Sequence, residues 1–527
     1  GTKEIRNIGI VGHGHAGKTS LVSAMLFDTG ATNRLGRVDE GTTITDYDED
    51  EITRKLTIHS SLAYCEWNQT KINILDTPGF AAFILDAKAA LSACNAALVL
   101  VDGVNGVEVQ TEKGWSFAEE FDLPRLLVVT KMDRERANFD QAIESIIEAF
   151  GRAAVPLQLP IGSETSFQGV IDLVHMRAYT YEKDGSGKPT EGDIPADLLD
   201  AAQSAREKII DVVAESSEEL MEKYFADGTL SDEDLIPGIK QAVCERRMFP
   251  IFTASGVANI GIQPLLNEIV ELVPAPDELG PIKGHPNPDS DEIIEREVKD
   301  IAPFSAFVFK TIADPFAGRI NVFKVNSGNV KSDSTVYNIT KNTQERLGPL
   351  HVVLGKSLEK IPEAHAGDIV AVTKLRETTT GDSFCDKANP IAYEPVKFPT
   401  PAIAFAIEPK SRNDEDKLSQ AIHKMLEEDM ALRFDRDPQT KEFLLSGSGQ
   451  THIEVAVNKL KKRYGVEVAL HPPKVAYLET FKGRAEIVGR HKKQTGGRGQ
   501  FGEATCVFEG LPRGGGFQFA LFISCVT

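Results

Sequence analysis

The stretch GHGHAGKT, residues 12–19, restricts the possible folds of this chain more than any other segment. It follows the short apolar run IGIVG and precedes KTSLVSAMLFDTG, which has the composition of a helix with a natural end at Gly30. Glycines allow the backbone to curl so that its N–H groups point at phosphate oxygens, and a helix N-terminus adds partial positive charge. Because the motif lies between a predicted strand and a predicted helix, it predicts a phosphate-binding loop rather than a chance glycine-rich turn.

Polar loops follow three further apolar runs, KINILDTPG, ALVLVDG and LLVVTKMD, and helical stretches separate these runs. This alternation is typical of a parallel α/β sheet that binds ligands at the carboxyl ends of its strands. Residues 155–250 interrupt it with GVIDLVHMRAYTYEKDGSGK, a predicted strand pair with a Gly/Ser turn, and with acidic helices. We interpret that part as an insertion within a first domain that covers residues 1–280.

The rest of the chain changes pattern twice. After a linker rich in Pro and charge at 274–292, short strands with Gly, Asp and Asn turns predict a β-barrel over 281–398. A strand-helix-hairpin-helix-strand order predicts a ferredoxin-like α+β domain over 399–480. A further segment, 481–527, begins near Phe481. The predicted fold class is therefore multidomain α/β.

The charge balance limits the function classes. The formal net charge is -20, from 58 basic and 78 acidic residues, which excludes a protein whose whole surface coats nucleic acid. A basic run, KGRAEIVGRHKKQTGGRGQFG (482–502), could contact RNA phosphates or could be a solvated basic face.

Cysteine and apolar patterns indicate a compartment. The six cysteines have no CxxC or Cys/His ligand spacing, which is typical of a protein in a reduced cytoplasm. The eleven histidines also lack metal-ligand spacing, so we expect no transition-metal site. The N-terminus has no apolar core of a signal peptide, and no apolar run is long enough to span a membrane. We expect a cytoplasmic protein with no membrane partner.

Phosphate and Mg²⁺ contacts follow from the loop and the next strand. Lys18 would neutralise the β- and γ-phosphate oxygens, and Thr19 would hold Mg²⁺. Asp76 would hold the Mg²⁺ shell, and Gly79 would offer its N–H to the γ-phosphate, although DTPG alone could be a plain turn. The candidate phosphate-contact residues are Gly12, His13, Gly14, His15, Ala16, Gly17, Lys18, Thr19 and Ser20.

Thr57 is the candidate for a second hydroxyl on Mg²⁺ when a γ-phosphate is present. The acidic stretch before it, DYDEDE (46–51), is either a solvated mobile loop or a switch loop that phosphate and metal order. The two interpretations are compatible.

TKMD (130–133) addresses the base. The Asp133 carboxylate can accept two hydrogen bonds from the N1 and N2 edge of guanine, where adenine has no matching donors. The Lys131 stem can lie over the ring, and Thr130 precedes it. The alternative is a solvated loop at a strand end, but the position after the fourth apolar run favours guanine.

These motifs, in this order, resemble those of bacterial translational GTPases of the elongation factor G class, and most of all the elongation factor G-like paralogues. GRVDEGTTITDYDEDE, AGDIVAVTKLRETTTGDSFCD and KKQTGGRGQFG are also similar to segments of that family. The resemblance runs from Ile5 to about Phe519. Ser255, followed by Gly256, matches the fifth guanine-contact motif of the family.

The resemblance implies a P-loop GTPase domain with an inserted subdomain, a β-barrel, a ferredoxin-like domain and the start of a fourth, α+β domain. It implies GTP or GDP with Mg²⁺ as cofactors, hydrolysis of GTP, and Lys18 and Gly79 among the catalytic groups. It also implies the ribosome, RNA and proteins, as partner, movement of tRNA and mRNA as the task, and a monomer off the ribosome.

Four positions depart from the family pattern. The family has Asp where this chain has His15, Gly where it has Lys55 and Asn where it has Thr130. It has a catalytic His where this chain has Phe80. Phe has no hydrogen-bonding group and cannot orient water, and the loss of such a group commonly lowers a rate about 10²- to 10⁴-fold. His15 and His59 are candidate substitutes for that group, and plain packing of the loop is the alternative account of Phe80.

Three activities therefore stay open: a GTPase that promotes translocation, a GTP-responsive ribosome-binding factor with slow or no hydrolysis, and a rescue or protection factor of the same class. The family has a complete fourth domain and a fifth, whereas this sequence stops at 527 within an apolar FALFISCVT. We therefore expect a fragment or a truncated chain.

Overall fold

The computed structural model describes residues 1–314, 316–477 and 479–522. Cys525 and the last part of FALFISCVT lie outside these ranges, so the expectation about the end of that stretch falls outside the described residues. The chain divides into two compact units, Gly1–Asp435 with Phe443–Pro472, and Arg436–Glu442 with Pro473–Thr527.

A seven-stranded sheet with the order β2-β3-β1-β4-β5-β11-β6 forms the first domain. β2 runs antiparallel to β3, and the other neighbours pair in parallel. The strands are β1 (Ile5–Gly12), β2 (Ser61–Trp67), β3 (Thr70–Asp76), β4 (Ala96–Asp102), β5 (Arg125–Thr130), β6 (Ala154–Pro156) and β11 (Phe249–Thr253). The helices are η1 (Thr2–Glu4), α1 (Lys18–Asp28), α2 (Glu49–Arg54), α3 (Ile84–Leu91), α4 (Val109–Glu120), α5 (Phe139–Phe150) and α9 (Ile262–Leu272).

Two apolar cores cover the faces of this sheet, because alternate side chains of a strand point to opposite faces. On β1, Ile8 and Ile10 join one core and Val11 joins the other, all with 0% exposure. The carboxyl ends of β1, β3 and β5 all meet one edge, as parallel strands must, and this edge carries the predicted motifs.

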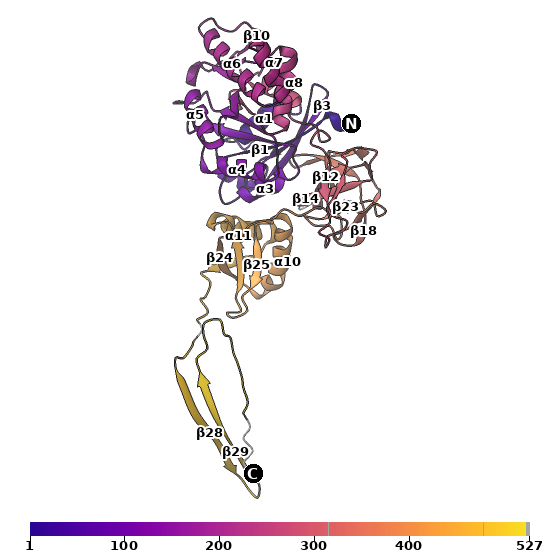
Figure 1. Cartoon of the computed structure of the whole chain (residues 1–527). Coiled ribbons are helices and arrows are strands. Elements are labelled where there is room, and N and C mark those ends of the chain that lie inside the picture. Colours follow the sequence, from indigo (N-terminus) through magenta and orange to yellow (C-terminus); the bar gives the residue numbers. More distant parts are fainter. Residues whose placement is uncertain (315, 478, 523–527) are drawn as a thin grey trace. The chain divides into compact units, whose positions relative to one another are not determined.

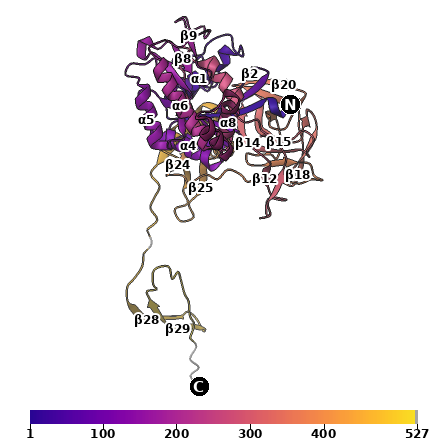
Figure 2. The same cartoon turned by 45° about the horizontal axis from the view of Figure 1, so that its top comes forward.

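The insertion folds as a four-stranded antiparallel sheet, order β10-β9-β8-β7, with three α-helices and one short 3₁₀ helix. Its elements are β7 (Gln158–Ile161), η2 (Glu164–Ser166), β8 (Gly169–Asp172), β9 (Arg177–Tyr181), β10 (Pro189–Gly192), α6 (Leu199–Glu215), α7 (Glu218–Asp227) and α8 (Asp232–Cys244). The predicted strand pair is present as β8 and β9, and the Gly/Ser turn leads on to a third strand, β10. Helices α6 and α8 lie side by side (Figures 1 and 2) and extend one apolar core of the first sheet.

An antiparallel eight-stranded sheet, order β18-β17-β23-β14-β15-β22-β19-β20, follows around its own apolar core. Its strands are β14 (Ser305–Asp314), β15 (Gly318–Ser327), β17 (Thr335–Asn338), β18 (Thr343–Arg346), β19 (Leu350–Leu354), β20 (Ser357–Ile361), β22 (Ile369–Thr373) and β23 (Ser383–Cys385). Two small ribbons accompany it: β12 (Ile282–Gly284) with β13 (Ile294–Arg296), and β16 (Val330–Lys331) with β21 (Glu363–Ala364).

The third domain has the predicted strand-helix-hairpin-helix-strand order. Its elements are β24 (Ile403–Pro409), α10 (Arg412–Glu428), β25 (Arg433–Arg436), β26 (Phe443–Gly447), α11 (Gln450–Tyr464) and β27 (Val468–His471), with sheet order β25-β26-β24-β27. Leu418, Ile422 and Met425 are buried on one face of α10, as their spacing predicts.

The second unit contains an antiparallel hairpin of β28 (Arg484–Gln494) and β29 (Gly499–Glu509), the two long arrows of Figure 1. Its side chains, including those of the basic run, are exposed. Taken together, the elements confirm the predicted multidomain α/β fold class. In the described parts of the chain, we find no helix with both the length and the apolarity needed to cross a membrane.

Candidate nucleotide-binding site

The predicted phosphate loop joins the end of β1 to the start of α1. The helix begins at Lys18 with Gly17 as its N-cap, and Gly17 has φ 89. His15 has φ 64, in the left-handed region that non-glycine residues rarely adopt. These two positive φ values curl the backbone back on itself in front of the helix N-terminus, where N–H groups lack partners within the helix.

Lys18 lies under this loop with 6% exposure. Its Nζ donates to the carbonyl oxygens of Gly12, at 3.1 Å, and of His13, at 2.7 Å. Burial lowers the pKa of Lys18 to about 8, while the nearby Asp76 and Asp46 carboxylates act in the opposite direction.

Gly79 has no room for a side chain. A Cβ at this position would lie 2.2 Å from Lys18 Nζ and 2.5 Å from the Gly12 carbonyl oxygen. The loop after β3 therefore touches the phosphate loop directly, and the Thr77 hydroxyl, which donates to Ile10 O at 2.6 Å, holds it there.

A cluster of oxygen atoms lies beside the start of α1. The Thr19 and Thr57 hydroxyls are 3.1 Å apart, and Thr57 donates to Asp46 Oδ1 at 2.8 Å. Thr45 donates to Asp76 Oδ2 at 2.6 Å, whereas Asp76 Oδ1 is buried and accepts no hydrogen bond from the described residues. An all-oxygen set with one unsatisfied carboxylate oxygen fits the ligand preference of Mg²⁺.

The interpretation of the acidic stretch 46–51 as a solvated loop is wrong for most of its residues. Asp46, Asp50 and Glu51 have only 4%, 8% and 2% exposure, and the stretch runs into helix α2. Glu51 Oε1 accepts the backbone N–H groups of Ile58 and His59 at 3.0 and 3.1 Å. A sequence signal was present, because Asp48 followed three residues later by Glu51 is a capping-box pattern, and the box forms.

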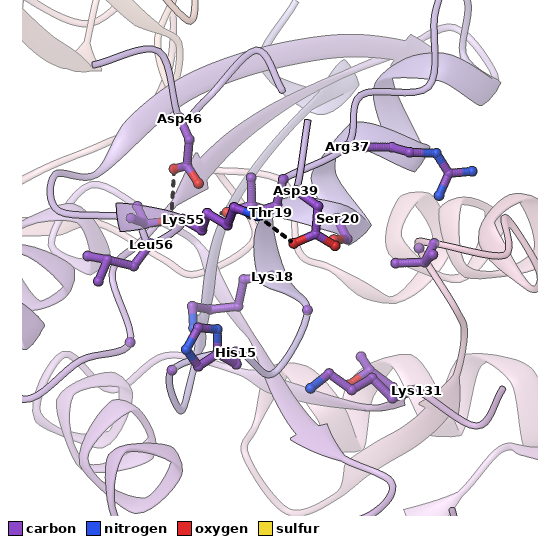
Figure 3. A pocket seen from close by; sticks show the side chains of 18 of the residues that line it. His15, Lys18, Thr19, Ser20, Arg37, Asp39, Asp46, Lys55, Leu56 and Lys131 are labelled. Atoms are coloured by element: carbon purple, nitrogen blue, oxygen red, sulfur yellow. Dashed lines mark hydrogen bonds and ion pairs between the residues drawn. The ribbon is translucent and has the colours of Figure 1, made fainter. Parts of the chain in front are cut away.

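Lys55 ends α2 in the left-handed conformation, with φ 55. This geometry favours glycine, and a residue with a side chain adopts it at a cost of about 1 kcal/mol. The Lys55 Nζ points toward Asp39, at 3.8 Å, across the pocket (Figure 3).

Phe80 packs on the phosphate loop. Its ring meets the His15 ring edge-on, with centroids 5.1 Å apart and planes at 89°, and it lies so close to Gly14 that a Cβ there would be 3.0 Å from it. It also belongs to an apolar cluster with Ile58 and Val455. Burial lowers the pKa of His15, and the neighbouring lysines Lys131 and Lys18 add to that effect.

The residues predicted to face the base come from two loops. The Thr130 hydroxyl donates to Ala16 O at 2.6 Å, which ties the end of β5 to the phosphate loop. Lys131 Nζ pairs with Asp102 Oδ2 at 2.8 Å. Asp133 is half-buried and forms no hydrogen bond or ion pair with the described residues.

The second of these loops packs on helix α1. A Cβ at Gly256 would lie 2.5 Å from the Ser20 backbone, so the loop approaches α1 as closely as a glycine allows. The Ser255 backbone pairs with Ile260, and its hydroxyl accepts from the Ala258 N–H at 3.1 Å.

One cavity of about 320 Å³ brings these loops together, a size typical of small-molecule sites. The predicted residues that line it are Gly14, His15, Gly17, Lys18, Thr19, Ser20, Thr57, Gly79, Phe80, Thr130, Lys131, Asp133, Ser255 and Gly256. Gly12, His13 and Ala16 lie behind that wall, and their carbonyl oxygens accept hydrogen bonds from Lys18 and Thr130. Asp76 is buried and does not line the cavity, but its charge acts on Lys18. Figure 3 shows Lys18, Thr19 and Lys131 around the same space.

Sequence reasoning missed several residues of this wall: Leu35, Gly36, Arg37, Val38, Asp39, Asp46, Lys55, Leu56, Arg134 and Val257. Most of them belong to the segment between α1 and β2, where the stretch GRVDEGTTITDYDEDE resembles the family but has no residue pattern that by itself points to a ligand. Two of them carried a signal: Asp46 through its place in an acidic stretch just before Thr57, and Lys55 as a departure from the family pattern.

Comparisons with known proteins match nearly the whole chain. The sequence profile of the Elongation factor Tu GTP binding domain matches residues 3–275, and that of Elongation factor G domain 2 matches 303–387. Elongation Factor G, domain III, matches 398–472, and Elongation factor G, domain IV, matches 473–525. A crystal structure of a protein from Thermus thermophilus is 34% identical, with a TM-score of 0.84, over 96% of this chain and 73% of that one.

Proposed function

The chain belongs to the elongation factor G-like translational GTPases, and on this premise we propose that it acts on the ribosome and promotes movement of tRNA and mRNA with hydrolysis of GTP to GDP and phosphate. The domains are those of a GTP-binding translation factor. The single observation that carries the proposal is the convergence of the phosphate loop, the DTPG loop, Thr57 and the TKMD loop on one cavity.

We assign the phosphate end to Lys18, Gly79 and the loop N–H groups. Lys18 is held in place by two loop carbonyls, so its charge is fixed beside the cavity. Thr19, Thr57 and Asp76 would hold Mg²⁺, which would supply charge neutralisation of the phosphates. The Gly79 N–H would respond to the γ-phosphate, and its close contact with Lys18 would couple the two.

We assign the base end to Asp133, Lys131, Thr130, Ser255 and Gly256. The free Asp133 carboxylate suits the N1 and N2 edge of guanine. The Thr130 hydroxyl donates to Ala16 O and so supports the loop. This hydrogen bond would replace part of the role of the side-chain amide of the family's Asn. Gly256 lets its loop approach the helix that carries Ser20.

One observation favours a second function, a GTP-responsive ribosome-binding factor with slow or no hydrolysis. Phe80 stands at the position of the family's catalytic His and packs on His15 and Ile58, with no group that could orient water. Neither His15 nor His59 is a strong base here, because burial lowers the pKa of both, that of His59 to about 4.

GTP turnover with and without ribosomes, for the parent and for Phe80→His, separates the two functions. If Phe80 limits hydrolysis, Phe80→His raises the ribosome-stimulated rate by about 10² or more. Fast turnover by the parent, with no gain from the substitution, would show that Phe80 does not limit the reaction and would favour the first function. GTP binding without any effect of ribosomes would contradict both.

We further propose that the chain works in the cytoplasm as a monomer off the ribosome. The proposed domain limits are 1–280, with the insertion at about 155–250, then 281–398, 399–480 and 481–527. A rescue or protection role within the same class would use the same nucleotide site.

A further inference from the structure

A second cavity, of about 380 Å³, lies between the insertion and helix α9 and shares no lining residue with the nucleotide cavity. Its walls come from three elements: Asn68 in the β2–β3 turn, Asp172 and Tyr179 from the insertion sheet, and Asn267 and Glu268 on α9. Three regions of the sequence therefore converge on one space that the proposed function does not use.

Glu268 is the unusual group in this wall. It has 8% exposure, and it forms no hydrogen bond or ion pair with the described residues. Burial raises the pKa of Glu268 well above its usual range, and the negative charges of Asp172 and Glu271 add to that effect. A buried carboxylate without a partner costs free energy, so this site favours either a proton on Glu268 or a bound cation that pairs with the carboxylate.

The neighbouring Asp172 is already satisfied. Its Oδ1 accepts the backbone N–H groups of Val174, at 2.9 Å, and His175, at 3.1 Å, and its Oδ2 lies 2.8 Å from His175 Nδ1. The carboxylates of the wall that can still accept hydrogen bonds from a ligand are therefore those of Glu268 and of the exposed Glu271. Among the described residues that line the cavity, none is a lysine or an arginine that could neutralise them.

The chemistry of the wall favours an organic cation over a metal ion. Nowhere in the described parts of the chain do three or more His, Cys, Asp or Glu side chains converge as metal ligands. The amide oxygen of Asn267 is already taken, because it accepts from Trp67 Nε1 at 2.8 Å and from Asn68 Nδ2 at 3.1 Å. Tyr179 adds an aromatic ring, a surface that attracts ammonium groups.

We propose that this cavity binds a small organic cation of the polyamine class, with one alkylammonium group on the Glu268 carboxylate and another toward Glu271. A space of this size accepts a flexible chain more readily than a single ion. The ammonium group supplies the donors that Glu268 lacks, and the second carboxylate selects for a second positive charge.

Isothermal titration of spermidine into the nucleotide-free chain at physiological salt tests the proposal. We expect saturable 1:1 binding, at least tenfold weaker in Glu268→Gln. The matched control is Glu148→Gln, an exposed glutamate on α5 that has no hydrogen-bond or ion-pair partner among the described residues, and it should change the affinity less than twofold. Circular dichroism and thermal unfolding verify that each variant is folded.

Two arms decide the class of ligand. A short lysine peptide should bind more weakly than spermidine. Excess Mg²⁺ should weaken spermidine binding to the parent no more than it weakens spermidine binding to the control variant Glu148→Gln. Unchanged spermidine binding by folded Glu268→Gln would overturn the proposal, as would the absence of saturable binding to the parent. Binding of the lysine peptide but not of spermidine would overturn the polyamine assignment. None of these results bears on the nucleotide cavity, so the proposed function fails or stands separately.

Discussion

Gly79 and Phe80 are neighbours in the chain but depend on different effects. Position 79 has room only for glycine, because Lys18 Nζ and the phosphate-loop backbone occupy the volume that a Cβ would need. Phe80 is set by packing, against His15 and an apolar cluster. The two roles that we propose for these adjacent positions, sensing of the γ-phosphate and placement of water, are therefore separable.

Gly79→Ala tests the first role. The added methyl group must push the DTPG loop away from Lys18, so we expect affinity for a non-hydrolysable GTP analogue to fall at least tenfold, and affinity for GDP to fall less. Fluorescence titration with a labelled nucleotide measures both. Gly192→Ala is the matched control, since a Cβ there meets nothing within 4 Å and should leave both affinities unchanged. An equal loss for the two nucleotides would argue against γ-phosphate sensing.

Asp133→Asn tests the guanine contact. Loss of an acceptor for two hydrogen bonds should weaken GTP binding by about 1.5–3 kcal/mol, roughly 10- to 150-fold. Asp140→Asn, an exposed aspartate at the start of α5, is the control and should be silent. Competition binding with GTP and ATP is the measurement. Equal affinity of the parent for ATP and GTP would refute the role given to Asp133.

At the scale of elements, helix α2 is held by helix α11. Arg463 Nη2 pairs with Asp48 Oδ2 at 2.6 Å, and Asn458 Nδ2 donates to Asp50 Oδ1 at 2.5 Å. Behind them, Lys459 and Arg463 both pair with Glu428 at the end of α10. The segment that carries Thr57 is therefore connected to the third domain through charged groups.

Stability should depend on the charge of Glu428. Burial would raise its pKa, but Lys459, His59 and Arg463 outweigh burial and lower the pKa to about 2, from an ordinary 4.5. A carboxyl with a lowered folded pKa stabilises fully above the unfolded value and loses that contribution as the pH falls toward the folded value. The stabilisation by Glu428 is therefore present above about pH 4.5 and disappears between there and about pH 2.

Urea unfolding at a series of pH values measures this contribution. Glu428→Gln should lower the free energy of unfolding by about 3 kcal/mol at pH 7, because two cations lose their buried partner, and by much less near pH 2. Glu415→Gln, on the exposed side of the same helix, should follow the parent at every pH. A Glu428→Gln deficit that stays constant down to pH 2 would contradict the assignment.

Across the whole molecule, structure that depends on a short stretch of sequence could be predicted, whereas structure that depends on contacts between residues far apart in the chain could not. Strand, loop and helix around GHGHAGKT follow from local pattern, as does the buried face of α10. The burial of Asp50 depends on Asn458, 408 positions away, so an acidic run looked solvated. The cavity wall between α1 and β2 likewise forms only when that segment folds over the nucleotide loops.

Nucleotide-dependent association with ribosomes tests the proposed function most directly. Purified chain is sedimented with bacterial ribosomes in the presence of a non-hydrolysable GTP analogue, of GDP, or of the matching ATP analogue, and the bound fraction is measured. We expect at least tenfold tighter association with the GTP analogue than with GDP or the ATP analogue. Association that is absent, or equal in all three conditions, would contradict a GTP-responsive ribosomal factor.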